Sequence, residues 1–343
     1  MKNLCAAKIK EITCGAAWIG EADGMLVFHR FTKEQEAFYA RRNPQYAGKV
    51  ASTAGVRCLF KTDSKRLQLR IHVQPGTSRR YFAMDVTVNG KYVGSLHNFD
   101  GVDLQTDYTA GDFPLGDFEG EFALGDGEKE VAILFPWSVE ARLSALALDD
   151  GATVTSAVPQ RTLLAFGDSI THGYDVLHPR NTYVERMAAA LHLTAYNKAI
   201  GGEIMVPGLA GINEAVAPDI VTVAYGTNDW KSRDSADAFE ADAELFFAQL
   251  RRRYSDATIV CITPIFRADG DTQRPFGPFE TVAQRLQITA DEYSVYLVDG
   301  MTLVPHDVRF YADRRLHPND DGAAHYAAAL LQAIEQPLKF TFL

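Results

Sequence analysis

Cysteine is scarce in this chain of 343 residues, and the four cysteines show no spacing typical of disulfide pairs. They are Cys5, Cys14, Cys58 and Cys261, with no Cys-x-x-Cys among them. Cysteines scattered in this way argue against a disulfide scaffold and against a thiolate zinc site. We interpret them as reduced thiols in a cytoplasmic protein, and a Cys5–Cys14 disulfide stays open as the less favoured alternative.

Long apolar runs and an excess of positive charge are also missing. No stretch approaches the roughly 20 apolar residues that a membrane-spanning helix needs. Lys8, Lys10 and Glu11 interrupt the N-terminal segment, so we expect no signal peptide. The formal net charge is −10 and the pI is about 5.4, without a basic stripe that could neutralise phosphates. We therefore expect neither a membrane nor a nucleic acid as a partner.

The sequence patterns of common metal and nucleotide sites are absent as well. The chain has no His-x-x-x-His, no cysteine cluster and no EF-hand loop. Its glycine-rich pieces fit neither Gly-x-Gly-x-x-Gly nor a P-loop. We expect a protein that works without a metal or another cofactor.

The chain does contain ample apolar material for a core, at 47% of its residues, and the first half arranges it in a β pattern. Residues 1–158 carry alternating or β-branched stretches, with turn signals at roughly ten-residue intervals. Asn89-Gly90, between two such stretches, is typical of a type I′ hairpin turn. We predict a β-sandwich of the jelly-roll kind with one short helix at 32–41. The predicted strands are 50–60, 66–73, 80–88, 91–93, 130–135 and 144–148.

Residues 159–343 alternate strand-like and helix-like segments instead. Such alternation predicts a parallel sheet with helices on both faces, a three-layer α/β/α fold. The domain boundary is expected between residues 152 and 160, where Pro159 and polar residues interrupt the pattern. The predicted strands are 162–166, 194–199, 220–225, 258–262 and 295–298, and the predicted helices are 182–191, 236–254, 281–291 and 322–336.

The most informative stretch directly follows the first of these strands. It reads Phe166-Gly167-Asp168-Ser169-Ile170-Thr171-His172-Gly173. A serine at the carboxyl end of a parallel strand stands where open α/β sheets bind their ligands. By itself Gly-Asp-Ser is also compatible with a plain turn, because Asp and Ser are common turn residues.

Three later segments follow this stretch in order. Asn197-Lys198-Ala199-Ile200-Gly201-Gly202 ends one predicted strand, and Tyr225-Gly226-Thr227-Asn228-Asp229 ends the next. Leu316-His317-Pro318-Asn319-Asp320 precedes the last predicted helix. Together the four segments, within residues 160 to 335, resemble the SGNH (GDSL-type) hydrolase family. The resemblance implies a flavodoxin-like hydrolase domain, and the preceding β-sandwich makes the chain similar to two-domain bacterial carbohydrate esterases.

The resemblance also implies a nucleophile and its base. Ser169 matches the family's nucleophile and His317 the histidine that takes its proton, because a serine hydroxyl needs an adjacent base to attack. The family usually has an aspartate three residues before this histidine, where the present chain has Arg314. Asp313 stands four residues before it, and we predict that a one-residue bulge brings Asp313 to the ring. A Ser–His pair whose ring is oriented by a backbone carbonyl stays open as the alternative.

Three donors are expected to form the oxyanion hole. They are the backbone N–H of Ser169, the backbone N–H of Gly202 and the side-chain amide of Asn228. Fixed donors of this kind stabilise the negative charge that develops on a tetrahedral intermediate. Gly201 stays open as the alternative to Gly202.

Three more residues are candidates to line the substrate pocket. Trp230 follows the Asn-Asp pair and would suit stacking on a sugar or packing on an acyl chain, with a packing role equally open. His172 lies near Ser169 in the sequence, and a turn role is favoured for it over that of the base. Asp168 is expected to hold the loop through backbone hydrogen bonds.

The expected function is that of a metal-free serine esterase. The likeness to carbohydrate esterases favours short acyl groups, acetyl above all, on small-molecule or oligosaccharide substrates. Acyl transfer, a lipase and a thioesterase stay open, because the chemistry up to the acyl-enzyme is the same. An inactive carbohydrate-binding protein is the least favoured alternative. A homo-oligomer is a candidate assembly.

Overall fold

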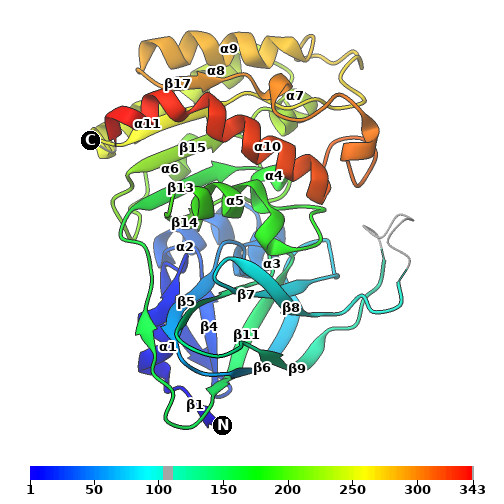
Figure 1. The fold of residues 1–343 in the computed structure, drawn as a ribbon. Coiled ribbons are helices and arrows are strands. Elements are labelled where there is room, and N and C mark those ends of the chain that lie inside the picture. Colours follow the sequence, from blue (N-terminus) through cyan, green and yellow to red (C-terminus); the bar gives the residue numbers. More distant parts are fainter. Residues whose placement is uncertain (103–110, 342–343) are drawn as a thin grey trace. The chain divides into compact units, whose positions relative to one another are not determined.

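The computed structural model describes residues 1–102 and 111–341 (Figure 1). Contacts divide them into two compact units. The first comprises Met1–Gln160 with the short segments Leu177–Arg180 and Thr194–Tyr196, and the second comprises the rest. The predicted boundary between residues 158 and 159 lies two residues from the first break, and the two short segments were not foreseen.

The first unit contains two sheets, in each of which the paired strands run antiparallel. One has the order β3-β4-β11-β6-β9, with β1 beside β11, and the other has the order β12-β5-β10-β7-β8, with β2 beside β5. The strands of the first sheet are β1 (Lys2–Asn3), β3 (Trp18–Ala22), β4 (Met25–His29), β6 (Arg66–Pro75), β9 (Gly116–Ala123) and β11 (Val139–Leu148). Those of the second are β2 (Thr13–Cys14), β5 (Arg57–Thr62), β7 (Ala83–Val88), β8 (Lys91–His97), β10 (Lys129–Leu134) and β12 (Thr155–Ser156).

One apolar core joins these two sheets. Every second residue from Leu67 to Val73 of β6 is buried, because successive side chains of a strand point to opposite faces. Its inward residues belong to the same cluster as Phe60 of β5 and Ile133 of β10 in the other sheet. The unit is therefore a two-sheet sandwich. The finer jelly-roll assignment stays a prediction.

Local sequence signals placed several elements of this unit correctly. Asn89 and Gly90 have φ of 49° and 74°, as a type I′ hairpin turn between β7 and β8 requires. The predicted helix at 32–41 is α2 (Lys33–Arg42), and Thr32 and Gln35 form a capping box at its start. Among the described residues of this unit, the sequence patterns did not predict the α-helices α1 (Ala6–Ile12) and α3 (Ala47–Ala51) or the short 3-10 helix Pro44–Tyr46.

The predicted strand over residues 50–60 was wrong in its first half. Residues 50 and 51 belong to α3, and the backbone N–H of Val56 bonds the carbonyl of Thr53 in a turn. Gly55 has a φ of 80°, which is left-handed rather than extended backbone. The strand β5 therefore begins only at Arg57.

The second unit is built on one five-stranded sheet with the order β14-β13-β15-β16-β17. In chain order this is 2-1-3-4-5, the flavodoxin-like arrangement, and β13, β15, β16 and β17 pair in parallel. The order reverses between β13 and β15, and open sheets bind ligands outside the carboxyl ends of strands at such a point. All five strands were predicted. They are β13 (Thr162–Gly167), β14 (Thr194–Asn197), β15 (Ile220–Ala224), β16 (Thr258–Ile262) and β17 (Tyr296–Val298).

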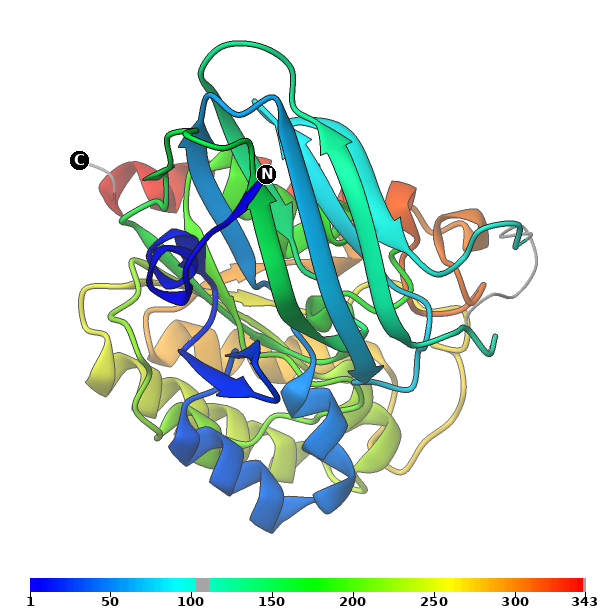
Figure 2. The same ribbon diagram turned by 90° about the horizontal axis from the view of Figure 1, so that it is seen from below.

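Helices cover both faces of this sheet (Figures 1 and 2). Crossovers between parallel strands are right-handed, so connections that run in opposite directions along the sheet place their helices on opposite faces. The helix α5 packs against α10, and α8 packs against α9. The predicted last helix, 322–336, is divided in the structure into α10 and α11 near Ile334. The helices are α4 (Ser169–His172), α5 (Tyr183–Ala190), α6 (Pro207–Ala210), α7 (Thr227–Ser232), α8 (Ala236–Arg253), α9 (Glu280–Glu292), α10 (Asp320–Ala333) and α11 (Glu335–Thr341).

The structure also bears on membrane-spanning helices and disulfides, neither of which the sequence led us to expect. Within residues 1–102 and 111–341, no helix combines the length and the apolar character that crossing a membrane requires. All four cysteines are free thiols, so the Cys5–Cys14 disulfide is not formed.

Candidate active site

Ser169 stands where the strand β13 turns into the short helix α4. Asp168 caps this helix, because its Oδ1 accepts the backbone N–H of Ile170 at 3.0 Å. Gly173 ends the helix in the left-handed conformation, with a φ of 111°. The serine is 5% exposed. The turn therefore holds Ser169 at the carboxyl edge of the sheet, as the sequence predicted.

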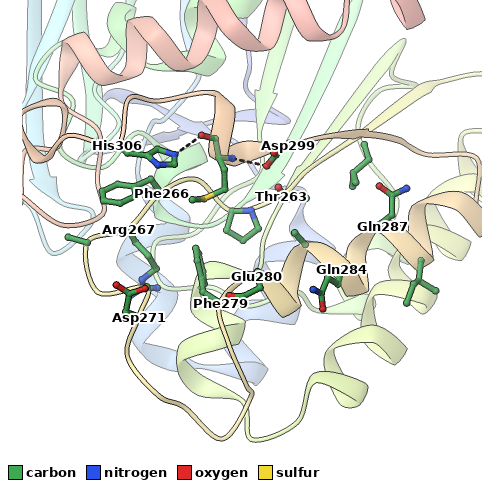
Figure 3. Close-up of a pocket in the computed structure, with 17 residues that line it drawn as sticks. Thr263, Phe266, Arg267, Asp271, Phe279, Glu280, Gln284, Gln287, Asp299 and His306 are labelled. Carbon is green, nitrogen blue, oxygen red and sulfur yellow. Dashed lines mark hydrogen bonds between the residues drawn. The ribbon is translucent and has the colours of Figure 1, made fainter.

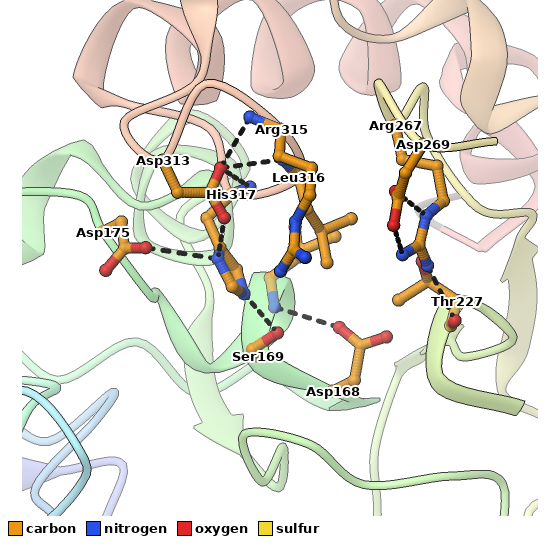
Figure 4. Close-up of polar contacts among 11 residues, drawn as sticks. Asp168, Ser169, Asp175, Thr227, Arg267, Asp269, Asp313, Arg315, Leu316 and His317 are labelled. Atoms are coloured by element: carbon orange, nitrogen blue, oxygen red, sulfur yellow. Dashed lines mark hydrogen bonds and ion pairs between the residues drawn. The ribbon is translucent and has the colours of Figure 1, made fainter. Parts of the chain in front are cut away.

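His317 lies within hydrogen-bond distance of this serine, although 148 residues separate them (Figure 4). Its Nε2 is 2.8 Å from Ser169 Oγ. On the other side of the ring, Nδ1 is 2.8 Å from Oδ2 of Asp313. With a carboxylate at Nδ1, the proton of a neutral ring sits on Nδ1, and Nε2 is the acceptor for the serine proton. The structure thus brings together the three residues that the sequence named.

The loop that carries Asp313 and His317 accommodates the unusual spacing of four residues. Oδ1 of Asp313 accepts the backbone N–H groups of Arg315, Leu316 and His317 at 3.0, 2.7 and 3.1 Å. Arg314 has a φ of 55°, in the left-handed region that side chains other than glycine rarely adopt. The one extra residue is therefore absorbed by left-handed backbone at Arg314, which is the bulge that the sequence analysis required.

A second carboxylate, which the sequence analysis missed, also faces the histidine. Oδ2 of Asp175 lies 3.2 Å from His317 Nδ1, and the Asp175 side chain is fully buried. Asp175 comes from the loop after α4, six residues beyond Ser169 (Figure 4). An aspartate in a loop is common in any sequence, so only proximity in the fold distinguishes this one.

These contacts shift the protonation of the site in defined directions. Burial lowers the pKa of His317, and the hydrogen bonds to Asp175 and Asp313 raise it by more, to about 9. Burial raises the pKa of Asp313, while the His317 ring and the backbone donors hold that pKa well below its usual range. Burial raises the pKa of Asp168 to about 7. The imidazolium that forms when His317 takes a proton is thus strongly favoured.

Two of the expected oxyanion donors follow β14 and β15: Gly202 lies in the turn after β14, and Asn228 lies in the first turn of α7. The backbone N–H of Gly201 bonds His172 Nδ1 at 3.2 Å, so this donor is already used. Gly202 has a φ of 84° in a turn closed by the Glu203 N–H and the Ile200 carbonyl. This arrangement favours Gly202 over Gly201 as the donor. The third candidate, Asn228, uses one of its two amide hydrogens on the carbonyl of Glu203 at 3.0 Å.

All three residues predicted to line the substrate pocket are buried, which corrects that prediction. Trp230 is 0% exposed, and its Nε1 donates to the carbonyl of Gly277 at 2.9 Å. The guanidinium groups of Arg267 and Arg274 lie 4.8 and 4.5 Å from the centre of its ring. An aromatic ring covered in this way is unavailable for stacking on a sugar.

His172 and Asp168 also serve the loops around the serine rather than a ligand. His172 is fully buried, and its ring packs edge-on against Tyr174 at 5.4 Å between centroids. Its Nδ1 holds Gly201, as described above. Asp168 is buried and caps α4, which agrees with the loop-holding role expected for it. Neither side chain is on an accessible surface.

One group of side chains has the composition of a metal site, among the residues that the structure describes. It consists of Asp175, Asp313 and His317, whose ligand atoms lie within 4.8 Å of one another. The two carboxylates meet at the same ring nitrogen, at 3.2 and 2.8 Å. These are the distances of hydrogen bonds to one N–H. We therefore interpret the two carboxylates as acceptors that orient the histidine ring.

Comparison with protein families identifies the domain that holds this site. Residues 165–325 match the model of the GDSL-like lipase/acylhydrolase family. The chain carries a GDSL-like hydrolase domain. The resemblance to SGNH hydrolases, inferred from four short segments, is thereby confirmed. No curated protein sequence matches the chain significantly.

Solved structures share the fold over nearly the whole chain. A salicylyl-acyltransferase of a tetracycline biosynthetic pathway is 20% identical, with a TM-score of 0.77 and 94% of each chain covered. A Bacteroides ovatus protein described as a GDSL-like lipase is 17% identical, with a TM-score of 0.75 and coverage of 96% of this chain and 97% of that one. A family two carbohydrate esterase of Cellvibrio japonicus is 16% identical, with a TM-score of 0.64 and coverage of 97% and 98%.

The GDSL-like domain also contains a large hollow that does not include the serine. Its volume is about 900 Å³, and it lies beside α9 at the carboxyl ends of β16 and β17 (Figure 3). Aromatic and aliphatic side chains line it together with several polar ones, among them Phe266, Phe279, Met301, Arg267 and His306. Ser169 and His317 do not line it. The chemistry is assigned to the serine because, within residues 1–102 and 111–341, a nucleophile, a histidine base and a carboxylate form one chain of hydrogen bonds only there.

Proposed function

We propose that this protein is a serine esterase that removes short acyl groups, acetyl above all, from carbohydrate esters. The single observation that carries the proposal is the continuous contact from Ser169 Oγ to His317 Nε2 and from His317 Nδ1 to Asp313, with both distances at 2.8 Å. A nucleophile within reach of a base, which is oriented in turn by a carboxylate, is the arrangement that acyl transfer through a serine requires.

In the proposed first step, Ser169 Oγ attacks the ester carbonyl while His317 Nε2 takes its proton. Negative charge then develops on the former carbonyl oxygen, toward which the N–H groups of Ser169 and Gly202 and the amide of Asn228 are proposed to point. The imidazolium gives its proton to the leaving alcohol oxygen as the carbon–oxygen bond breaks. The products of this step are the free alcohol and an acyl group on Ser169.

In the second step, His317 removes a proton from a water molecule that attacks the acyl-enzyme. The tetrahedral intermediate collapses, the carboxylic acid leaves, and the proton returns to Ser169 Oγ. Asp313 stays ionised throughout, because the backbone donors and the ring hold its pKa well below the usual range. Its role is to keep the proton of the neutral ring on Nδ1 and to stabilise the imidazolium.

The choice of substrate class is supported by the carbohydrate esterases among the similar structures. They include a family two enzyme of Clostridium thermocellum in complex with cellohexaose and an acetyl xylan esterase of Butyrivibrio proteoclasticus, which are 15% and 14% identical to this chain. At such identities the likeness supports the fold, and the substrate is our proposal.

The test is hydrolysis of p-nitrophenyl esters from acetate to octanoate by the wild type and by Ser169→Ala. We expect serine-dependent turnover that falls steeply with chain length, followed by acetate release from acetylated xylo- or cello-oligosaccharides. Turnover that persists in Ser169→Ala would contradict the assignment of the nucleophile. Preference for long chains would replace the acetylesterase by a lipase or a thioesterase of the same superfamily.

Acyl transfer to an acceptor other than water is the second candidate function. It is favoured by the salicylyl-acyltransferase, which matches 94% of this chain at the TM-score of 0.77. The two functions differ only in the second step, so adding alcohols or sugars to the p-nitrophenyl acetate assay separates them. Acceptor acetylation that exceeds acetate release would favour the transferase. The inactive carbohydrate-binding protein is disfavoured, since the hydrogen-bonded side chains of a nucleophile and its base are all present.

Partners and location remain proposals that rest on the sequence. We propose a small-molecule or oligosaccharide ester as the partner of the site, and neither nucleic acid nor membrane, in keeping with the net charge of −10. A cytoplasmic location is in keeping with four free cysteines. A homo-oligomer is tested by light scattering of the purified protein.

A further inference from the structure

Two carboxylates from different parts of the GDSL-like domain face one ring nitrogen. Asp313, on the loop of the histidine itself, is 2.8 Å from His317 Nδ1, and Asp175, on the loop after α4, is 3.2 Å from the same atom. We propose that Asp175 is a second positioning residue, which shares the Nδ1–H of His317 with Asp313 and stabilises the imidazolium together with it. This inference rests on the proposed esterase chemistry and assigns the site a support that the family motifs do not contain.

The structure holds Asp175 firmly in place. Its side chain is 0% exposed, and its backbone has a φ of 69°, in the left-handed region. The preceding residue, Tyr174, lies against the histidine, with 5.7 Å between the ring centroids. Non-glycine residues with such backbone occur where the surrounding structure determines the conformation, and functional sites are enriched in them. The carboxylate thus approaches the ring from an element independent of the Asp313 loop.

The electrostatic consequence has a definite sign. Besides Ser169 at Nε2, the titratable groups near His317 are Asp175 and Asp313 at Nδ1, the buried Asp168 and the adjacent Tyr174. The negative charge of each nearby carboxylate favours the protonated, positively charged form of the His317 ring. With a pKa of about 9, only roughly 1% of the histidine is neutral at pH 7 and able to act as the base. Removal of the Asp175 charge should therefore enlarge the neutral fraction.

The variant that tests this is Asp175→Asn, because asparagine tolerates left-handed backbone and keeps the shape of the side chain. The first readout is the pH dependence of kcat/KM for p-nitrophenyl acetate. We expect the acid limb of this pH profile to move to lower pH by about one unit. A pKa of His317 that is lower by one unit makes the neutral fraction of this histidine at pH 7 about tenfold larger. We also expect a lower plateau at alkaline pH, because a weaker acceptor orients the ring less well. A purely structural role would lower kcat/KM equally at every pH without moving the limb.

A second readout keeps the inference separate from the proposed function. The His317 ring is titrated by NMR, with its signals assigned by comparison with His317→Gln. We expect the pKa of His317 to fall in Asp175→Asn, and to stay above its ordinary value in Asp313→Asn, where Asp175 still faces Nδ1. This titration reports on Asp175 even if the protein hydrolyses no ester. If Asp175→Asn does not fold, the pKa of His317 in Asp313→Asn still tests whether Asp175 acts on the ring.

The matched control is Asp117→Asn in the first unit. Asp117 makes the same type of contact, 2.8 Å from Nδ1 of another histidine, His72. We expect this variant to leave the acid limb and the His317 titration unchanged. An unchanged limb and an unchanged His317 pKa in Asp175→Asn, or an ordinary His317 pKa in Asp313→Asn, would overturn the inference.

Discussion

At the residue scale, the reactivity of Ser169 depends on how His317 is held. A hydrogen bond to each ring nitrogen fixes the tautomer, and both contacts measure 2.8 Å. Removal of the sole aspartate of a serine protease triad lowers kcat about 10⁴-fold, because the wrong tautomer then predominates. The present site differs from such a triad in having a second carboxylate.

This difference leads to a prediction for Asp313→Asn. With Asp175 still near Nδ1, we expect kcat/KM to fall by well under the roughly 10⁴-fold loss of a triad with one aspartate. The double variant Asp175→Asn/Asp313→Asn should approach the full loss. Kinetics of both variants with p-nitrophenyl acetate check this, and a full loss in the single variant would mean that Asp175 does not support the ring.

The pH dependence of the wild type is a second prediction at this scale. Only the neutral ring can accept the serine proton, and the pKa of His317 is raised to about 9 by Asp175 and Asp313 against the effect of burial. We therefore expect kcat/KM to rise as the pH increases and to level off above about 9. A profile that is flat from pH 6 upward would show that the base titrates near its ordinary value.

At the element scale, the loop between Tyr311 and Pro318 decides whether the triad forms at all. Tyr311 and Pro318 pair in an isolated antiparallel bridge, and Asp313 gathers three backbone N–H groups between them. The left-handed residue Arg314 lets five residues fit where the family motif uses four. The loop therefore has a defined conformation, which these hydrogen bonds and the left-handed backbone at Arg314 maintain.

Substitutions at Arg314 test this account. A β-branched residue is strained in left-handed backbone by roughly 1–2 kcal/mol, whereas glycine is not. We expect Arg314→Val to lower the free energy of unfolding by about that amount and to reduce activity, and Arg314→Gly to preserve both. Arg315→Val is the matched control, because Arg315 is exposed and lacks positive φ. Urea unfolding with parallel assays gives the answer, and equal effects at both positions would refute the role of the bulge.

At the scale of the whole molecule, the proposed chemistry needs nothing but the chain and water. The group most like a metal site is hydrogen-bonded within itself around His317 Nδ1. We expect incubation with EDTA or 1,10-phenanthroline, followed by desalting, to leave kcat/KM unchanged. Loss of activity that Zn²⁺ or another divalent cation restores would contradict a metal-free mechanism.

The large hollow beside α9 shows why the site could not be found from size alone. Drug-sized ligands commonly occupy hollows of several hundred Å³, and this one measures about 900 Å³, yet it holds neither the nucleophile nor the base. Arg267, which lines it, bonds both oxygens of Thr227 at 3.0 and 2.9 Å, next to Asn228. This contact joins one wall of the hollow to the first turn of α7, which contains the proposed oxyanion donor Asn228.

The sequence by itself determined the five strands of the second unit and named Ser169, His317 and Asp313 as candidate catalytic residues. Strand β16 was predicted over its full length, because a five-residue, mainly apolar run rich in β-branched residues is typical of a buried strand. Ser169 and His317 were named because four short segments, in order, resemble the motifs of the SGNH family. The hairpin at Asn89-Gly90 was predicted because both residues tolerate positive φ.

Only the tertiary structure decided which side chains meet. Asp175 has no local signal, and its contact with His317 joins residues 142 positions apart in this numbering. Trp230 looked accessible next to Asn228, but burial against Arg267 and Arg274 is set by segments distant in the sequence. Periodicity and turn preference act over a few residues, whereas contact, burial and the pKa values that follow from them depend on the packing of the whole domain.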